Sequence, residues 1–221
     1  MDYTLYYYIA AFLMLLSSGI AFFIGLRQSA GTLRVVVIYL LVSFLSDLIF
    51  RIAYIFFDFY IKTGVFFRLV EFVLLIEFYS LILQLKKLTI FKRFIQVISV
   101  VLYIVIFEFD LTLMRTTNSV FFSLLSTGFF IKMIMEMKVN DPLKFPLFWI
   151  NAAFLVYFSG SVFFSLSFDI LGRLHEMSAV LSFGFHNTLG LAKNILIAIA
   201  FWISYKHSDW DKSLLEIKER K

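Results

Sequence analysis

Seven apolar runs, each close to membrane-spanning length, are the feature that most constrains how this chain can fold. They cover about residues 4–26, 35–57, 65–85, 94–109, 117–137, 147–168 and 177–204. A transmembrane helix needs about 20 predominantly apolar residues, so the sequence predicts an all-α polytopic membrane protein, a seven-transmembrane-helix bundle. In a chain of 221 residues this leaves no length for a folded extramembrane domain. We expect a transmembrane domain over 1–206 and a short cytoplasmic amphipathic tail over 207–221.

The composition excludes a soluble protein. Charged residues make up 16% of the chain, against about 25% in soluble domains, and are too few to cover a water-facing surface. The sequence contains no cysteine, which rules out disulfides, a thiolate nucleophile and cysteine-ligated metal sites. In a soluble protein, a formal net charge of +5 would suggest binding to nucleic acid. In a membrane protein basic loops explain it better, so no nucleic-acid partner is expected.

The positions of the basic residues predict the topology. With the N-terminus outside, only Lys62, Arg115 and Arg173 lie in outer segments. The cytoplasmic segments then hold most of the 20 basic residues, namely Arg27, Arg34, Lys86, Lys87, Lys92, Arg93, Lys132, Lys138, Lys144, Lys206, Lys212, Lys218, Arg220 and Lys221. Because positive charge favours the cytoplasmic side, we predict an outer N-terminus and a cytoplasmic C-terminus.

Six charged residues within the second, third and seventh predicted spans are the strongest functional signal. They are Asp47 and Arg51 in the second span, Arg68, Glu71 and Glu77 in the third, and Lys193 in the seventh. Each costs roughly 2.5–3.5 kcal/mol at a helix centre, so such residues pair with one another or line a cavity. At a rise of about 1.5 Å per residue, depth within each span predicts two layers. The outer layer joins Arg51, Glu71 and Arg68; the central layer joins Lys193 to Asp47 or Glu77.

Polar and small residues recur at helical spacing beside these charges. The stripes are Tyr39, Ser43, Asp47 and Arg51 in the second span, Ala153, Tyr157, Ser161 and Ser165 in the sixth, and Ser178, Ser182, His186, Gly190, Asn194 and Ala198 in the seventh. Such stripes are typical of helix–helix packing, and a polar ligand cavity is the alternative. We predict a ligand site formed by Asp47, Arg51, Glu71, Glu77, His186 and Lys193. A supporting polar face is predicted from Ser43, Arg68, Tyr157, Ser161, Ser182, Asn187 and Asn194.

Three further segments carry a resemblance to a known group of proteins. They are Leu147-Phe148-Trp149-Ile150 with the run Phe154 to Gly160, the run Phe185-His186-Asn187 through Ala200-Phe201-Trp202, and the regions around Asp47, Glu71 and Glu77. Over nearly its whole length the chain resembles a group of small bacterial seven-helix inner-membrane proteins of unassigned function. The resemblance implies a seven-helix bundle in the bacterial inner membrane, with no catalytic residues to carry over.

An enzyme is not expected. Ser182-x-x-x-His186 is similar to an element of seven-helix metal-dependent hydrolases, but one intramembrane histidine cannot build a histidine-rich zinc site. We therefore predict no catalytic residue, no metal and no cofactor.

Three functions remain open. The leading hypothesis is a sensory or signalling module that binds a small ligand or a proton and acts through a cytoplasmic partner. A small-solute or ion transporter or channel using the same charges is the first alternative, and a structural or assembly subunit is the second. The expected partners are the lipid bilayer, a cytoplasmic signalling protein and a second copy of the chain.

Overall fold

In the computed structural model, the regular structure of the described residues is entirely helical. The described residues are 3–28, 31–56, 60–83, 93, 97, 101, 111–137, 141–174 and 176–207. The long helices are α1 (Tyr3–Gly25), α2 (Gly31–Phe56), α3 (Tyr60–Ile82), α5 (Leu111–Lys132), α6 (Pro146–Leu174) and α7 (Glu176–Lys206). A π-helical turn, η2 (Met133–Met137), and a 3₁₀ turn, η3 (Pro142–Lys144), follow α5. The predicted all-α class is therefore confirmed.

Five of these helices contain a segment long and apolar enough to cross a membrane. The segments are Leu5–Gly25, Gly31–Ile52, Arg115–Met135, Pro146–Ser167 and Val180–Lys206. Helix α3 is not among them, because Arg68, Glu71 and Glu77 interrupt its apolar sequence. The predicted span 94–109 lies outside the described residues apart from positions 97 and 101, and so does the tail from 208 to 221. The described part is thus a multi-pass membrane protein with five helices that are long and apolar enough to span the membrane, not the seven predicted.

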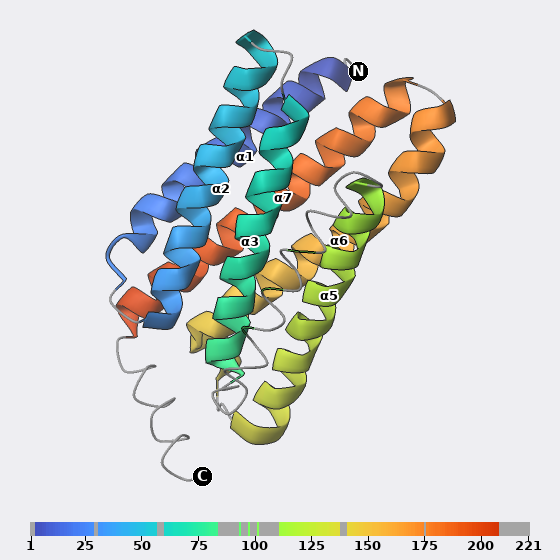
Figure 1. The fold of residues 1–221 in the computed structure, drawn as a ribbon. Helices are drawn as coiled ribbons and strands as arrows, with labels where there is room; N and C mark the ends of the chain where they lie inside the picture. Colours follow the sequence, from blue (N-terminus) through green and yellow to red (C-terminus); the bar gives the residue numbers. More distant parts are fainter. Residues whose placement is uncertain are drawn as a thin grey trace.

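The six long helices form a ring in the order α1, α2, α3, α5, α6 and α7. Helix α7 packs extensively against both α1 and α6, and α2 packs against both α1 and α3. The seam between α3 and α5 is the loosest neighbouring pair in this ring. In Figure 1, α2, α3 and α5 lie in front, and α1, α7 and α6 slant across behind them. Side chains that point into the ring can therefore meet from helices distant in sequence.

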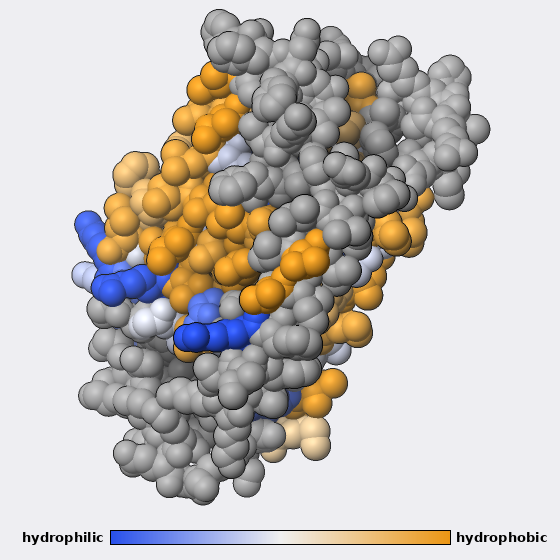
Figure 2. Space-filling view, in the orientation of Figure 1, coloured by the Kyte–Doolittle hydropathy of each residue, from blue (hydrophilic) through white to orange (hydrophobic). Residues whose placement is uncertain are grey.

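The bundle exposes apolar side chains and buries polar ones, as expected in lipid. Along α1 the exposed large side chains follow one side of the helix: Leu5, Tyr8, Ile9, Phe12, Leu13, Leu16, Ile20, Phe23 and Ile24. Figure 2 shows a broad hydrophobic surface across the described part of one face, with hydrophilic side chains at its margin. In contrast, Ser18, Ser126 and Asn151 are fully buried. Among the described residues, these polar side chains are therefore buried within a core that is mostly apolar.

Close contact between α1 and α7 depends on glycine. A methyl group at Gly184 would overlap the ring of Tyr6, and one at Gly190 would lie 2.6 Å from the Met14 sulfur. Small residues let helix backbones approach within a bilayer. Of the seventh-span stripe, Gly190 therefore lies in the packed interface between α1 and α7.

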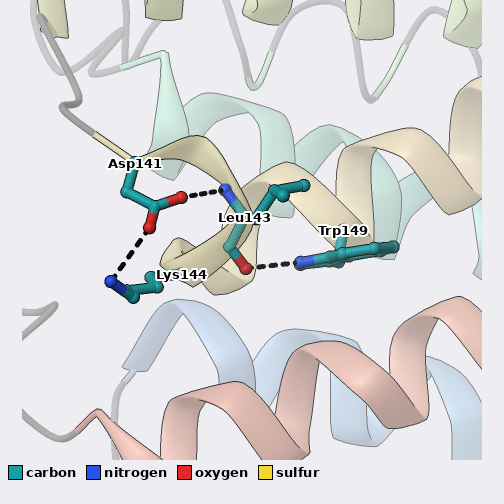
Figure 3. A network of polar contacts seen from close by, with 4 residues as sticks. All are labelled: Asp141, Leu143, Lys144 and Trp149. Atoms are coloured by element: carbon teal, nitrogen blue, oxygen red, sulfur yellow. Dashed lines mark hydrogen bonds and ion pairs between the residues drawn. The ribbon is translucent and has the colours of Figure 1, made fainter.

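The turn before α6 is capped by Asp141, whose polar contacts Figure 3 shows. An Asp141 carboxylate oxygen accepts a hydrogen bond from the Leu143 amide at 3.2 Å, and Lys144 forms an ion pair with the other oxygen at 3.0 Å. The indole of Trp149 donates to the Leu143 carbonyl at 2.8 Å. The Lys144 contact holds the pKa of Asp141 below its ordinary value. Helix α6 then begins at Pro146, a residue suited to a first helical turn, which confirms the predicted break.

Candidate functional site

A buried chain of three side chains joins three helices inside the ring. Lys193 of α7 donates a hydrogen bond from Nζ to the Tyr39 hydroxyl of α2 at 2.7 Å. That hydroxyl in turn donates to Glu71 Oε1 of α3 at 3.1 Å. The three side chains are almost fully buried, with exposed fractions of 4% for Lys193, 1% for Tyr39 and 6% for Glu71. We call Lys193, Tyr39 and Glu71 the central chain.

Aromatic rings surround the ammonium group of the central chain. Lys193 Nζ lies 4.5 Å from the ring centroid of Tyr157 and 4.9 Å from that of Tyr39. Both distances fall in the range in which a ring face attracts a cation, an attraction that grows where water is excluded. The ammonium group of Lys193 is thus held by a hydrogen bond to the Tyr39 hydroxyl and by the ring face of Tyr157.

The ring contacts continue from Tyr157 toward the end of the bundle where α5 and α7 begin. The His186 ring lies 5.6 Å from Tyr157 and 4.7 Å from Phe164, measured between ring centroids. The Arg115 guanidinium carbon lies 5.6 Å from the Phe164 centroid. A column of side chains from α5, α6 and α7 therefore connects Arg115 to the central chain.

The predicted pairing by depth is wrong for Glu71 and Arg51. Glu71 accepts from Tyr39 and so belongs with Lys193, whereas the prediction placed it in a separate outer layer with Arg51. Arg51 donates instead from Nη2 to the main-chain carbonyl of Ala11 in α1 at 2.9 Å. The physical reason is reach: long amphipathic side chains move their polar ends well away from the depth of their own backbone.

The remaining predicted residues take up different positions. Asp47 is partly buried on α2 and interacts electrostatically with Lys193 and Arg51. Asn194 donates from Nδ2 to the Met14 carbonyl at 3.3 Å and the Ser17 hydroxyl at 3.1 Å, so it serves the α1–α7 contact. Two others are buried: Ser43 in α2 and Ser161 in α6. The rest are partly buried: Arg68, Glu77, Ser182 and Asn187. Ligand binding by any of these residues stays a prediction.

Sequence reasoning missed a second buried polar group. The Tyr79 hydroxyl of α3 lies 2.5 Å from Ser126 Oγ of α5 and donates to Asn151 Oδ1 of α6 at 3.0 Å. Asn151 Nδ2 completes the group by donating to the Ser126 carbonyl at 2.8 Å. These bonds cross the loose seam between α3 and α5. A lone asparagine within an apolar run was the available signal, because a buried amide needs partners.

The described residues contain no group of three His, Cys, Asp or Glu side chains that could hold a metal ion. No protein-family model, curated protein or solved structure matches this chain. The resemblance to bacterial seven-helix inner-membrane proteins therefore stays a prediction. The feature of this protein that indicates a function is the central chain.

Proposed function

We propose that this protein is a membrane sensory module whose input is a proton or a small ligand at the central chain. The observation that carries the proposal is the hydrogen-bonded link from Lys193 through Tyr39 to Glu71. Ionisable side chains inside a membrane are costly and mark functional sites by default. A purely structural link between helices needs no charged groups, as the neutral Tyr79, Ser126 and Asn151 group illustrates.

The link gives the input a mechanical consequence. Lys193 lies on α7, whereas its partners lie on α2 and α3, neither of which is next to α7 in the ring. Neutralising either charged end, or offering it another partner, weakens the bonds that hold these helices together. The helices then have two arrangements, one with the link intact and one with it broken. A ligand shifts the equilibrium between these arrangements only if it binds them with different affinities, and a charge at the link supplies that difference.

The wider setting of the proposal follows from the sequence. We infer an outer N-terminus and a cytoplasmic C-terminus in the bacterial inner membrane. We infer that the output passes through a cytoplasmic partner. The tail over 207–221 is the segment proposed to dock it.

Purification in mild detergent followed by mass spectrometry tests the proposal. We expect a cytoplasmic effector to copurify with the wild-type protein, and the captured amount to change in Lys193→Met. Ile195→Met is the matched control, because Ile195 lies two residues later on α7 with a side chain that is 48% exposed. Equal capture by both variants and the wild type contradicts the sensory role of Lys193.

Flux into liposomes tests the transporter alternative. Solute or ion flux that is present in the wild type and absent in Asp47→Asn and Glu77→Gln would favour transport and overturn the sensory proposal. Under the sensory proposal, liposomes containing the wild-type protein and those containing the variants show the same background flux.

A further inference from the structure

Three polar atoms between α6 and α7 are buried without a hydrogen-bond partner. They are the hydroxyl oxygens of Ser161 and Ser165 on α6 and Nδ1 of His186 on α7. The two serines are 2% and 1% exposed. A helical serine usually donates to a carbonyl one turn earlier, as Ser159 does to Leu155 at 2.6 Å. Because buried polar groups are nearly always paired, these three atoms point to a bound group.

Helix geometry places the three atoms around one region. Tyr157 and Phe164 are seven residues apart on α6, and both rings contact His186. Ser161 lies between them, one turn from each, and therefore on the α6 surface that faces the imidazole. Ser165 follows one turn later. The two hydroxyls and the imidazole nitrogen thus line the same part of the bundle interior.

Positive charges lie at both ends of this region. The Arg115 guanidinium carbon of α5 lies 5.6 Å from the Phe164 ring centroid, and Lys193 Nζ of α7 lies 4.5 Å from that of Tyr157, the two rings that contact His186. Arg68 of α3 also acts electrostatically on His186, whereas the carboxylates of Glu71 and Asp47 act on Tyr157. Two hydroxyls can donate hydrogen bonds here, and an imidazole that carries its proton on Nδ1 adds a third donor. Donors directed into a region of positive potential are the features that recognise an anion in a water-poor environment.

We propose that Ser161, Ser165 and His186 bind one small monovalent anion, of the size of chloride or formate, between α6 and α7. The site lies along the ring column that reaches Lys193 through Tyr157. Binding there adds negative charge near the cationic end of the central chain and so gives the bundle a second input. Anion binding does not depend on the sensory role, since the same site could serve a transporter or a structural subunit.

Thermal unfolding in detergent tests this site. The protein is purified in gluconate buffer, whose anion is too large for the site, and is titrated with sodium chloride or sodium formate at constant ionic strength. We expect a saturable rise in the unfolding midpoint of the wild type. In Ser161→Ala combined with Ser165→Ala, the concentration that gives half the rise should increase at least tenfold.

Ser159→Ala is the matched control. Ser159 lies on the same helix, its side chain is exposed, and its hydroxyl is already bonded to Leu155, so its titration should match the wild type. If the double variant does not fold, Ser161→Ala alone supplies the comparison. The proposal is overturned if neither anion raises the wild-type midpoint saturably, or if removing the serine hydroxyls leaves the titration unchanged. If the wild type shows no saturable anion effect but still captures its effector, this site is refuted and the proposed function stands.

Discussion

Removing one hydroxyl group, in Tyr39→Phe, tests the central chain without changing the shape of the core. The Tyr39 hydroxyl accepts from Lys193 at 2.7 Å and donates to Glu71 at 3.1 Å. A hydrogen bond to a charged group contributes about 1.5–3 kcal/mol in soluble proteins, whereas polar contacts between membrane helices average about 0.6 kcal/mol and reach about 1.7 kcal/mol. Two such bonds, both to nearly buried ionisable groups, give an expected loss of about 2–4 kcal/mol in the free energy of unfolding.

Reversible unfolding in mixed detergent micelles, followed by circular dichroism, measures this loss. Tyr8→Phe is the control, because Tyr8 lies on α1 with a side chain that is 60% exposed. An exposed substitution of this kind changes the free energy of unfolding by no more than about 0.5 kcal/mol. If Tyr39→Phe and Tyr8→Phe are equally stable, the Tyr39 hydroxyl does not hold the helices together and the reasoning fails.

Three other perturbations test the packing, the second polar group and the loop. Gly184→Ala should cost about 1–3 kcal/mol of unfolding free energy by overpacking the α1–α7 contact. Gly128→Ala is the control, because Gly128 has open space around it, and it should be neutral or slightly stabilising. Equal effects of the two substitutions contradict the close approach of α1 and α7. Asn151→Leu should cost about 1–3 kcal/mol in the same unfolding assay, since it leaves the buried Tyr79 hydroxyl and Ser126 carbonyl without this partner. A neutral result argues that the Tyr79, Ser126 and Asn151 group does not stabilise the bundle. The lowered pKa of Asp141 means that its carboxylate stabilises the folded turn above about pH 4, the range of its unfolded pKa. That contribution disappears as the pH falls through the lower folded pKa, so Trp149 fluorescence should change there in the wild type but not in Asp141→Asn.

The positions of the helices could be predicted closely from the sequence, because every membrane span requires about 20 predominantly apolar residues. The run 147–168 corresponds to α6 beginning at Pro146, and the run 177–204 to α7 over Glu176–Lys206. The run 117–137 is less regular, since its last five residues form a π-helical turn and not the α-helix expected. The ionisable residues of α3 were recognised as informative, but they also keep this helix from meeting the composition of an apolar span.

The partners of the charged residues could not be predicted, because backbone depth does not fix where a long side chain ends. Lys193 reaches Glu71 through the hydroxyl of a third residue on another helix. Tyr39 was visible in the polar stripe of the second span, yet a tyrosine fits an apolar core as well as a polar contact. Only the ring arrangement of the helices shows that its hydroxyl lies between two charges.

A double-mutant cycle between Lys193 and Glu71 measures the central claim most directly. The unfolding free energies of the wild type, Lys193→Met, Glu71→Gln and the double variant give the coupling energy between the two side chains. The central chain predicts a coupling above about 1 kcal/mol that falls below about 0.5 kcal/mol when the cycle is repeated with Tyr39→Phe. Additive losses in both cycles, within about 0.5 kcal/mol, would contradict a tyrosine-bridged link between α7 and α3.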